Sequence, residues 1–335
     1  MVIDNEILIS SEPGFETCNK LDASVAYFVV CKKNEHLIGG IDAYNQIVAG
    51  EKIISWVARA CDNAKILEIN DYQNEIDAVL PCIDGSEYTV ILKGNIPLVM
   101  KQHLKDMLNF VMHRHMNACK LKGGYIFKTE YLKEVGKVLS ADCYNHQAND
   151  FFAVVDYDSL TFAREEISRR IYSYHSKNGV DFAGFDSCGI DANVQIGYGS
   201  SFGLGAKILH GSKILNDVSV GEYSVIESSL VKDNTIIGCG AIIKNCVIGL
   251  SCKIGDGVVL KNCKIGDGTI IEDGSRIFDC QIDRGVKINK LCDIASSNIS
   301  ANASIGAMSR LYNAFIEQSY EVFDGKVIIK RAEEE

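Results

Sequence analysis

Between Ile190 and Ile305 the chain carries an aliphatic or aromatic residue at nearly every sixth position, and this spacing limits the folds open to it. An α-helix would repeat such residues about every 3.6 positions and a strand about every 2. A six-residue period is typical of a parallel β-helix, in which each repeat forms one flat side and points one apolar residue inward. The residues in phase are Ile190, Ile196, Phe202, Ile208, Ile214, Val220, Ile226, Val231, Ile237, Ile243, Ile248, Ile254, Leu260, Ile265, Ile271, Ile277, Ile282, Ile288, Ile294, Ile299 and Ile305.

A second, 17-residue period starts after Ile226 and separates Val231, Ile248, Ile265, Ile282 and Ile299. A three-sided coil of hexapeptides takes about 18 residues, so we infer that one corner loses a residue in each later coil. Glycine and aspartate follow many of the inward residues, which suits tight corners. An antiparallel protein with many turns would not keep this phase.

The 17-residue period also predicts columns of side chains, because stacked coils lie ~4.8 Å apart. Cys246, Cys263 and Cys280 should form one such column, and Asn245, Asn262 and Asp279 a second. The thiols come near enough for a disulfide in principle. The simpler interpretation is that small side chains fill a crowded corner, where free cysteine behaves as a small hydrophobe.

Composition narrows the choice of compartment and partners. The chain has 335 residues, a net charge of −10 and 13 cysteines, with no CxxC pair. We therefore expect neither a disulfide framework nor a metal site. A reducing, cytoplasmic location follows, since there is no bilayer-spanning run or signal peptide. The negative charge and the lack of a basic run argue against nucleic acid as a partner.

The first half predicts strands that alternate with helices, which favours an open α/β sheet. Residues 1–157 would form this domain, 158–180 a connecting helix, 181–308 the β-helix and 309–335 a cap made of a short helix and a strand pair. The expected strands are Ala26–Cys31, Tyr88–Leu92 and Gly124–Phe127, and the expected helices are Lys52–Ala60, Gln102–His115, Thr129–Val138 and Asp158–Lys177.

This order of domains resembles the bifunctional N-acetylglucosamine-1-phosphate uridylyltransferase/glucosamine-1-phosphate N-acetyltransferase family. The resemblance implies that the β-helix is left-handed, that it packs side by side into a homotrimer, and that the ligand is a nucleotide sugar or sugar phosphate. The segments that carry it are Asp156-Tyr157-Asp158-Ser159-Leu160, Arg169-Arg170-Ile171, Asn178-Gly179-Val180, Ile190–Gly197, Val48-Ala49-Gly50-Glu51-Lys52 and Lys93-Gly94-Asn95-Ile96-Pro97-Leu98.

The chain departs from that family where nucleotidyl transfer needs phosphate and Mg²⁺ contacts. The family's glycine-rich loop LAAGxGTRM is replaced by a segment that keeps two lysines and two glycines. Its metal-binding aspartate matches Asn95, and its second metal ligand matches Val155, which cannot coordinate. Both positions argue against Mg²⁺, so we expect uridylyl transfer to be lost. The candidate residues for a remaining anion site are Lys32, Lys33, Gly39, Gly40, Lys52, Gly94 and Asn95; a solvated turn is the competing interpretation of the lysines and the glycine pair.

The acetyltransferase motifs of the family are missing as well. His210 is the one histidine between Ile190 and Ile305, and imidazole suits a general base in transfer from acetyl-CoA. A corner or surface histidine is the competing interpretation. Lys244 and Lys261 are separated by the same period as the cysteines and should stack along an edge, where they would hold an anion or oppose aggregation.

Three hypotheses follow from the sequence. The protein is a divergent transferase of the UDP-N-acetylglucosamine pathway type that retains sugar-phosphate or nucleotide binding. Alternatively, it is a catalytically inactive regulatory or scaffolding trimer. The third hypothesis is an acyltransferase that uses the β-helix alone, with His210 as its base.

Overall fold

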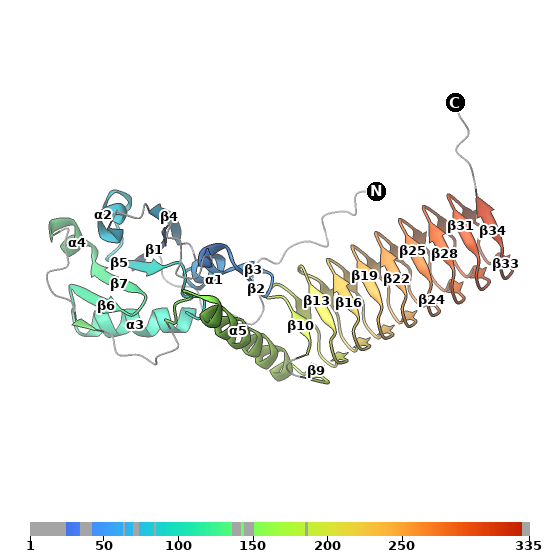
Figure 1. Ribbon diagram of the computed structural model, residues 1–335, viewed down its shortest axis with the longest axis horizontal. Coiled ribbons are helices and arrows are strands. Elements are labelled where there is room, and N and C mark those ends of the chain that lie inside the picture. The colour runs from blue at the N-terminus through green and yellow to red at the C-terminus, as the bar shows by residue number, and fades with distance from the viewer. Residues whose placement is uncertain are drawn as a thin grey trace, which may run out of the picture. The chain divides into compact units, whose positions relative to one another are not determined.

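The computed structural model describes residues 25–33, 42–62, 64–69, 74–83, 85–135, 142–143, 151–184 and 187–329 (Figure 1). The chain divides into two units, with the boundary at Ile167–Ser168. This boundary lies inside the helix α5 (Tyr157–Lys177), which confirms the helix expected from Asp158 to Lys177. None of the helices among these residues combines the length and hydrophobicity that crossing a bilayer requires.

The first unit holds a six-stranded sheet in the order β4-β1-β5-β7-β6-β8. Strands β4 (Lys65–Ile69), β1 (Ala26–Lys33) and β5 (Tyr88–Lys93) are parallel to one another. Strand β7 (Gly124–Lys128) runs antiparallel to β5 and to β6 (Ala118–Leu121), and β8 (Asp142–Cys143) pairs with β6. The three predicted strands are therefore present.

Helices cover both faces of this sheet because its strands are apolar on both sides. On one face, Phe28 and Val30 of β1 pack against α1 (Ile53–Ala60) and α3 (Lys101–His113). On the other, Val29 and Cys31 join a cluster with residues of α2 (Glu75–Val79) and α4 (Thr129–Val135). The remaining elements are the 3-10 helices η2 (Ala43–Asn45) and η3 (Leu80–Cys82) and the pair β2 (Ile47–Val48) and β3 (Glu51–Lys52).

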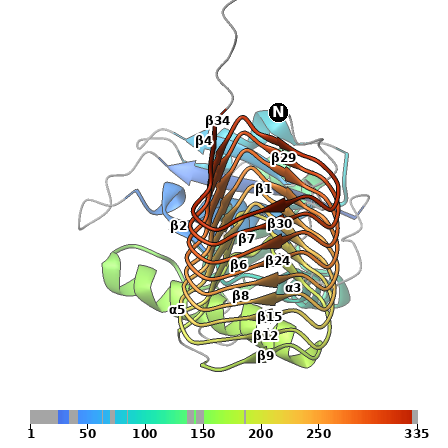
Figure 2. The same ribbon diagram turned by 90° about the vertical axis from the view of Figure 1, so that its right-hand side faces the viewer.

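The second unit is a left-handed parallel β-helix, whose stacked coils are seen in Figure 2. Side one has β9 (Asp181–Phe182), β12 (Ser201–Phe202), β15 (Ser219–Val220), β18 (Ile236–Ile237), β21 (Lys253–Ile254), β24 (Ile270–Ile271), β27 (Lys287–Ile288), β30 (Ser304–Ile305) and β33 (Glu321–Val322). Side two has β10 (Gly189–Ile190), β13 (Lys207–Leu209), β16 (Val225–Glu227), β19 (Ile242–Lys244), β22 (Val259–Lys261), β25 (Arg276–Phe278), β28 (Asp293–Ala295), β31 (Arg310–Tyr312) and β34 (Val327–Ile329). Side three has β11 (Gln195–Ile196), β14 (Lys213–Ile214), β17 (Leu230–Val231), β20 (Val247–Ile248), β23 (Lys264–Ile265), β26 (Gln281–Ile282), β29 (Asn298–Ile299) and β32 (Phe315–Ile316).

The register confirms that the hexapeptide residues stack inside the solenoid. Ile243 lies beside Leu260 on the next coil, and both are fully buried. The predicted shortening of the coil is also present. Lys207 pairs with Val225, an 18-residue step, whereas Lys213 pairs with Leu230, a 17-residue step. The shortened corner is therefore the one between sides two and three.

Small polar side chains bridge the coils at this corner. The Cys263 amide N–H donates to Cys246 Sγ at 3.4 Å, and the Ser297 amide donates to Cys280 Sγ at the same distance. Hydrogen bonding to the Cys246 thiol, together with burial, raises the pKa of Cys263 to about 12. These thiols are buried and free. The column of cysteines is therefore a set of corner bridges, equivalent to the serine bridge from the Cys246 amide to Ser229 Oγ.

The amide column is present as well. Asn245 Nδ2 donates to Asn262 Oδ1 at 3.3 Å, and Asn262 Nδ2 donates to Asp279 Oδ1 at 2.9 Å. All three residues have left-handed backbones, with φ between 52° and 54°. Short polar side chains tolerate this conformation better than most, which explains why asparagine and aspartate occur at the corner.

The prediction of a separate cap from residue 309 onward is wrong. The predicted helix at Ser309–Gln318 is replaced by β31 and β32, and the predicted hairpin strands β33 and β34 pair with β30 and β31 of the preceding coil rather than with each other. The β-helix thus continues to Ile329. The inward residues Leu311, Ile316 and Val322 keep the phase, but their neighbours change enough to imitate a helical pattern.

Candidate functional site

The parallel strands of the first unit bring several predicted residues to one edge of the sheet. Strands β1 and β5 are adjacent and parallel, with Cys31 opposite Lys93, so Lys32, Lys33, Gly94 and Asn95 all lie at their carboxyl ends. Ligands of open α/β sheets commonly bind at this edge. Gly39 and Gly40 lie outside the described residues. Lys52 ends β3, ahead of α1, and its side chain is exposed.

The two lysines of β1 do not form a single anion clamp. Consecutive residues of a strand point to opposite faces, and each lysine meets a different carboxylate. Lys32 Nζ lies 3.1 Å from Glu68 Oε1, and Lys33 Nζ lies 3.4 Å from Glu75 Oε1. Their charges are thus compensated on separate sides of the sheet, so the two lysines do not face one common ligand, and the anion site predicted from them stays a prediction.

Gly94 and Asn95 tie the strand end to its surroundings. The Gly94 amide donates to Cys31 O at 2.8 Å, and a Cβ on Gly94 would come within 3.2 Å of Tyr44 and Ile54. Asn95 is 7% exposed, its Nδ2 donates to Val154 O at 2.9 Å, and its Oδ1 is buried without a hydrogen-bond partner among the described residues. Close packing accounts for the glycine, whereas the amide oxygen of Asn95 is left unexplained by packing.

The residues near Asn95 do not fit a Mg²⁺ ion. Val155 lies next to Val154 and is 44% exposed, but it offers no ligand atom. Asp156, the acid next to Val155 in sequence, already caps α5, because its Oδ1 accepts the Ser159 amide N–H at 2.8 Å. Hydrogen bonding to Ser159 holds the pKa of Asp156 below its usual value. In the described parts of both units, no group of three or more His, Cys, Asp or Glu side chains is placed to hold a metal ion.

His210 occupies the corner between sides two and three, in the longer coil. Its φ of 51° is left-handed, which histidine adopts more readily than most residues. Two side chains of the preceding coil hold this corner: Asp191 Oδ2 accepts the His210 amide at 2.9 Å, and Asn193 Oδ1 accepts the Gly211 amide at 3.0 Å. The backbone that carries the imidazole is thereby fixed.

The His210 side chain is paired with an acid and, through it, with a base. Nδ1 of His210 lies 3.2 Å from Glu227 Oε1, and Lys244 Nζ lies 2.5 Å from Glu227 Oε2. The hydrogen bond from Lys244 holds the pKa of Glu227 below its usual value, with a smaller contribution from His210. The His210 side chain remains 56% exposed. An ionised carboxylate therefore faces Nδ1, which leaves Nε2 for chemistry.

Glu227 and Lys244 were missed as members of this site, although the sequence contains the signal. The coil period places Lys244 and Lys261 in one column, and Glu227 stands one such period before Lys244. Extending the column backward by one coil would have reached Glu227. Glu227 also stands 17 residues after His210, so the same count leads from Lys244 through Glu227 to His210, although Glu227 pairs in register with Leu209 across an 18-residue step.

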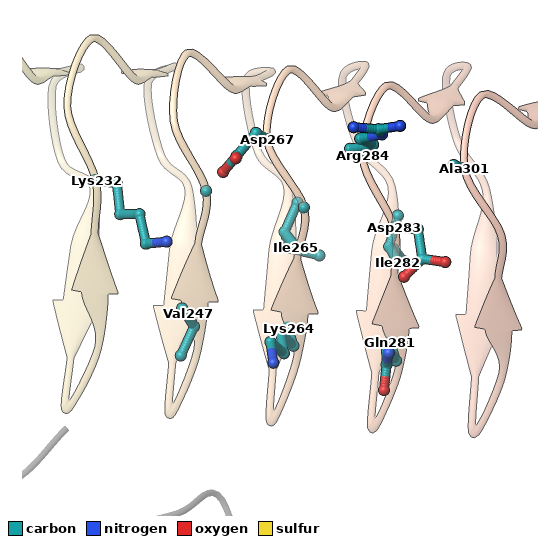
Figure 3. Close-up of a pocket in the computed structure, with 12 residues that line it drawn as sticks. Lys232, Val247, Lys264, Ile265, Asp267, Gln281, Ile282, Asp283, Arg284 and Ala301 are labelled. Carbon is teal, nitrogen blue, oxygen red and sulfur yellow. The ribbon is translucent and has the colours of Figure 1, made fainter. Parts of the chain in front are cut away.

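A groove of about 360 Å³ runs along side three and its following corner. Lys264 and Gln281 lie toward one rim, while Asp267 and Arg284 lie toward the other (Figure 3). Lys232 contributes a third cation. Asp267 Oδ1 accepts the Leu250 amide at 2.8 Å, so one acid is already engaged. The groove thus presents three cationic side chains, from Lys232, Lys264 and Arg284, together with the acids Asp267 and Asp283.

The comparisons with known proteins give a match for the β-helix. Residues 184–265 match the family model of the GMPPB C-terminal domain. This segment includes His210, Glu227 and Lys244, and the match supports the resemblance of this part of the chain to a hexapeptide β-helix. The search of curated proteins found no match.

Two solved structures were also found. One is the acetyltransferase domain of PglB from Neisseria gonorrhoeae FA1090, with 16% identity, 78% of this chain and 96% of that chain covered, and a TM-score of 0.32. The other is the same domain in complex with acetyl coenzyme A, with 14% identity, the same coverage of both chains and a TM-score of 0.28. These scores are too low to establish a shared arrangement of the whole chain.

Proposed function

We propose that the protein is an acyltransferase that works through its β-helix, with His210 as the general base and an acyl thioester such as acetyl-CoA as the donor. The observation that carries this proposal is the pairing of His210 Nδ1 with ionised Glu227. Such an arrangement holds the proton on Nδ1 and leaves Nε2 basic. Among the residues that the structure describes, Nε2 has no hydrogen-bond partner assigned to it.

The proposed reaction is a simple acyl transfer. Nε2 of His210 takes a proton from an acceptor amine or hydroxyl as that group attacks the thioester carbonyl. A new bond forms between the acceptor and the acyl carbon, the carbon–sulfur bond breaks, and the thiolate receives the proton from the imidazolium. Glu227 stabilises the imidazolium while it exists.

The groove along side three supports the proposal as a place for the anionic part of the donor. His210 lies at the corner before β14 of this side, and the groove lies at the other end of the side-three strands, from Lys232 on the next coil to Ala301 further along. Lys232, Lys264 and Arg284 would face the donor's phosphates, and the spacing of the coils suits an elongated ligand. Lys264→Ala and Arg284→Ala should therefore raise the KM for the donor more than they lower kcat.

Turnover of acetyl-CoA with a panel of amino-sugar and hydroxyl acceptors tests the reaction. His210→Ala should lower kcat about 10²- to 10⁴-fold, the range expected for loss of a general base. The matched control is His113→Ala, which removes an exposed histidine at the end of α3. Equal turnover in wild type and His210→Ala would exclude His210 as the base. Absence of turnover in a folded wild type would favour the scaffolding hypothesis instead.

A second candidate function is binding of a nucleotide sugar or sugar phosphate by the first unit. The specific observation is Asn95 Oδ1, a buried acceptor at the carboxyl edge of the parallel strands for which the described part of the chain supplies no donor. We expect binding without uridylyl transfer, since the Mg²⁺ ligands do not fit. Calorimetry with UTP, UDP-N-acetylglucosamine and both hexosamine phosphates tests this, with Asn95→Ala as the variant and Asn117→Ala as a control outside the strand edge. Absence of binding heat for every ligand would reject this second function.

We further propose a cytoplasmic homotrimer that packs through the β-helix. Exposed apolar residues on the solenoid support an interface of this kind, among them Ile236 at 50% and Ile270 at 37% on side one. The free thiols of the described residues suit a reducing compartment. Light scattering coupled to size exclusion gives the mass, and a monomer at micromolar concentration would reject the trimer.

A further inference from the structure

The candidate base is connected to a lysine one coil beyond its acid. Glu227 and Lys244 are directly opposite each other in the register of β16 and β19, and Lys244 binds Oε2 of the carboxylate whose Oε1 faces His210. We propose that Lys244 is a positioning residue for the proposed acyl transfer: its ammonium anchors Glu227 so that Oε1 meets Nδ1 of His210. This inference rests on the proposed function for its catalytic consequence, but its geometric part does not.

Lys244 is suited to anchor the carboxylate, whereas the neighbours in its column are not. On one side of Glu227 the column continues with Leu209, which offers no donor. Beyond Lys244 it continues with Lys261, whose ammonium lies 5.8 Å from the centre of the Phe278 ring instead. The Glu227 side chain is 27% exposed, so without an anchor its carboxylate is free to rotate into solvent. Lys244 is thus the residue that selects one rotamer.

The charges around His210 explain why the anchor is needed. Asp191 faces its backbone from the preceding coil, Glu227 and Lys244 face its side chain from the following coils, and Lys207 and Lys213 flank it in its own coil. Asp191 is engaged with the amide N–H, so Glu227 is the acid that reaches Nδ1. Because hydrogen bonding to Lys244 keeps the pKa of Glu227 low, the carboxylate stays ionised throughout the range in which imidazole titrates.

The consequence is a fixed tautomer. A neutral imidazole whose Nδ1 donates to a carboxylate carries its proton there and exposes an unprotonated Nε2. If Glu227 rotates away, the proton is free to move to Nε2, and the atom that faces the acceptor becomes a donor. Lys244 therefore acts on the proposed reaction without touching substrate.

The test is ¹⁵N NMR of the full chain labelled at histidine, above the pH at which the imidazoles are protonated. The His210 signal is assigned by its loss in His210→Ala. In wild type we expect the Nδ1–H tautomer at His210, and in Lys244→Met a shift toward Nε2–H. Lys244→Arg should restore the wild-type pattern, since it can still donate to Oε2. The matched control, Lys261→Met, should change nothing. An unchanged tautomer in Lys244→Met would overturn the proposal.

Kinetics provide the second readout. Lys244→Met should lower kcat by roughly tenfold to a hundredfold, as expected for a misplaced catalytic group, with little change in the KM of the donor. Wild-type kcat in Lys244→Met would contradict the inference. The two proposals fail separately: a wild type without turnover rejects the acyltransferase, while the NMR result still decides whether Lys244 anchors Glu227. Melting curves confirm that each variant is folded.

Discussion

The two units place candidate residues in different ways. In the sheet, Lys32 and Lys33 are adjacent in sequence, yet they bind Glu68 and Glu75 on opposite faces. In the β-helix, Glu227 and Lys244 are a whole coil apart in sequence, yet their side chains touch. In the strand, neighbours in sequence point to opposite faces, so closeness in sequence does not predict a shared ligand. In the solenoid, residues one coil period apart are stacked, so the period does predict contact. The chemistry of each unit follows its own geometry.

The largest difference in the free energy of unfolding should appear between substitutions on the inward and outward sides of one solenoid strand. Ile243 points inward and is fully buried, whereas its neighbour Ile242 points outward and is half-buried. Ile243→Ala should lower the free energy of unfolding by about 2 to 5 kcal/mol, because it leaves a cavity between stacked coils. Ile242→Ala should cost about 1 kcal/mol or less. Urea denaturation followed by circular dichroism measures both, and similar losses would contradict the inward–outward assignment.

The next largest effect should be a loss of stability at acidic pH. His175 of α5 is 3% exposed, its Nδ1 has no partner in the described chain, and burial lowers its pKa to about 4. The unfolded state, with a pKa near 6.5, binds the proton more readily, so stability falls as the pH drops from about 6.5 to 4. The loss should reach about 2 to 3 kcal/mol at the acidic end.

His175→Leu removes this titration and provides the comparison. Its stability should change less between pH 7 and 4 than that of wild type, when both are measured by urea denaturation. His113→Leu, an exposed histidine, should keep the wild-type dependence. Identical pH curves for wild type and His175→Leu would show that other groups cause the acid sensitivity.

A smaller effect is expected at the cysteine corner. Cys263 stands in the same column as Ser229 and Ser297, and Cys263 Sγ donates to Lys261 O at 3.0 Å. Cys263→Ser should therefore change the free energy of unfolding by about 1 kcal/mol or less, since the hydroxyl can make the same bridge. Differential scanning calorimetry provides the measurement. A loss of several kcal/mol would mean that the thiol has a role that serine cannot replace.

The smallest effect should come from the paired lysines of β1. Lys32→Gln and Lys33→Gln each remove a partly exposed ion pair, for which about 0.2 to 1 kcal/mol is typical. Because the two pairs lie on opposite faces, the double variant should equal the sum of the single variants. Chemical denaturation of the three variants decides this. A coupling well above the experimental error would indicate that both lysines share a partner.

The sequence predicted the solenoid and its columns because each coil repeats the same constraint. The inward residues, the cysteine corner and the Lys244–Lys261 stack all follow from counting, and the structure confirms them. The end of the solenoid was predicted less well. The residues after Ser309 carry the same inward phase, but their aromatic and polar neighbours differ from the earlier coils, and local pattern alone favoured a helix there.

The candidate site was only partly predictable, for physical reasons. His210 could be selected because its residue type is rare in the β-helix. Its acid, Glu227, lies one regular 17-residue step further along, but the period alone does not show that the two side chains turn toward each other. In the sheet, the edge that gathers Lys33, Gly94 and Asn95 follows from parallel strands, but the carboxylates that neutralise the lysines come from β4 and α2. Such contacts depend on tertiary packing rather than on any repeat in the sequence.

The extra residue at the His210 corner has a wider consequence. A solenoid with identical coils is a lattice in one dimension, and every surface feature on it recurs at each step. A change of coil length breaks that translational symmetry in the backbone itself. The single change of coil length, marked by the 18-residue step from Lys207 to Val225 and the 17-residue step from Lys213 to Leu230, supplies the break. It distinguishes the six-residue corners after Ile190 and Ile208, the second of which carries His210, from the five-residue corners of the later coils.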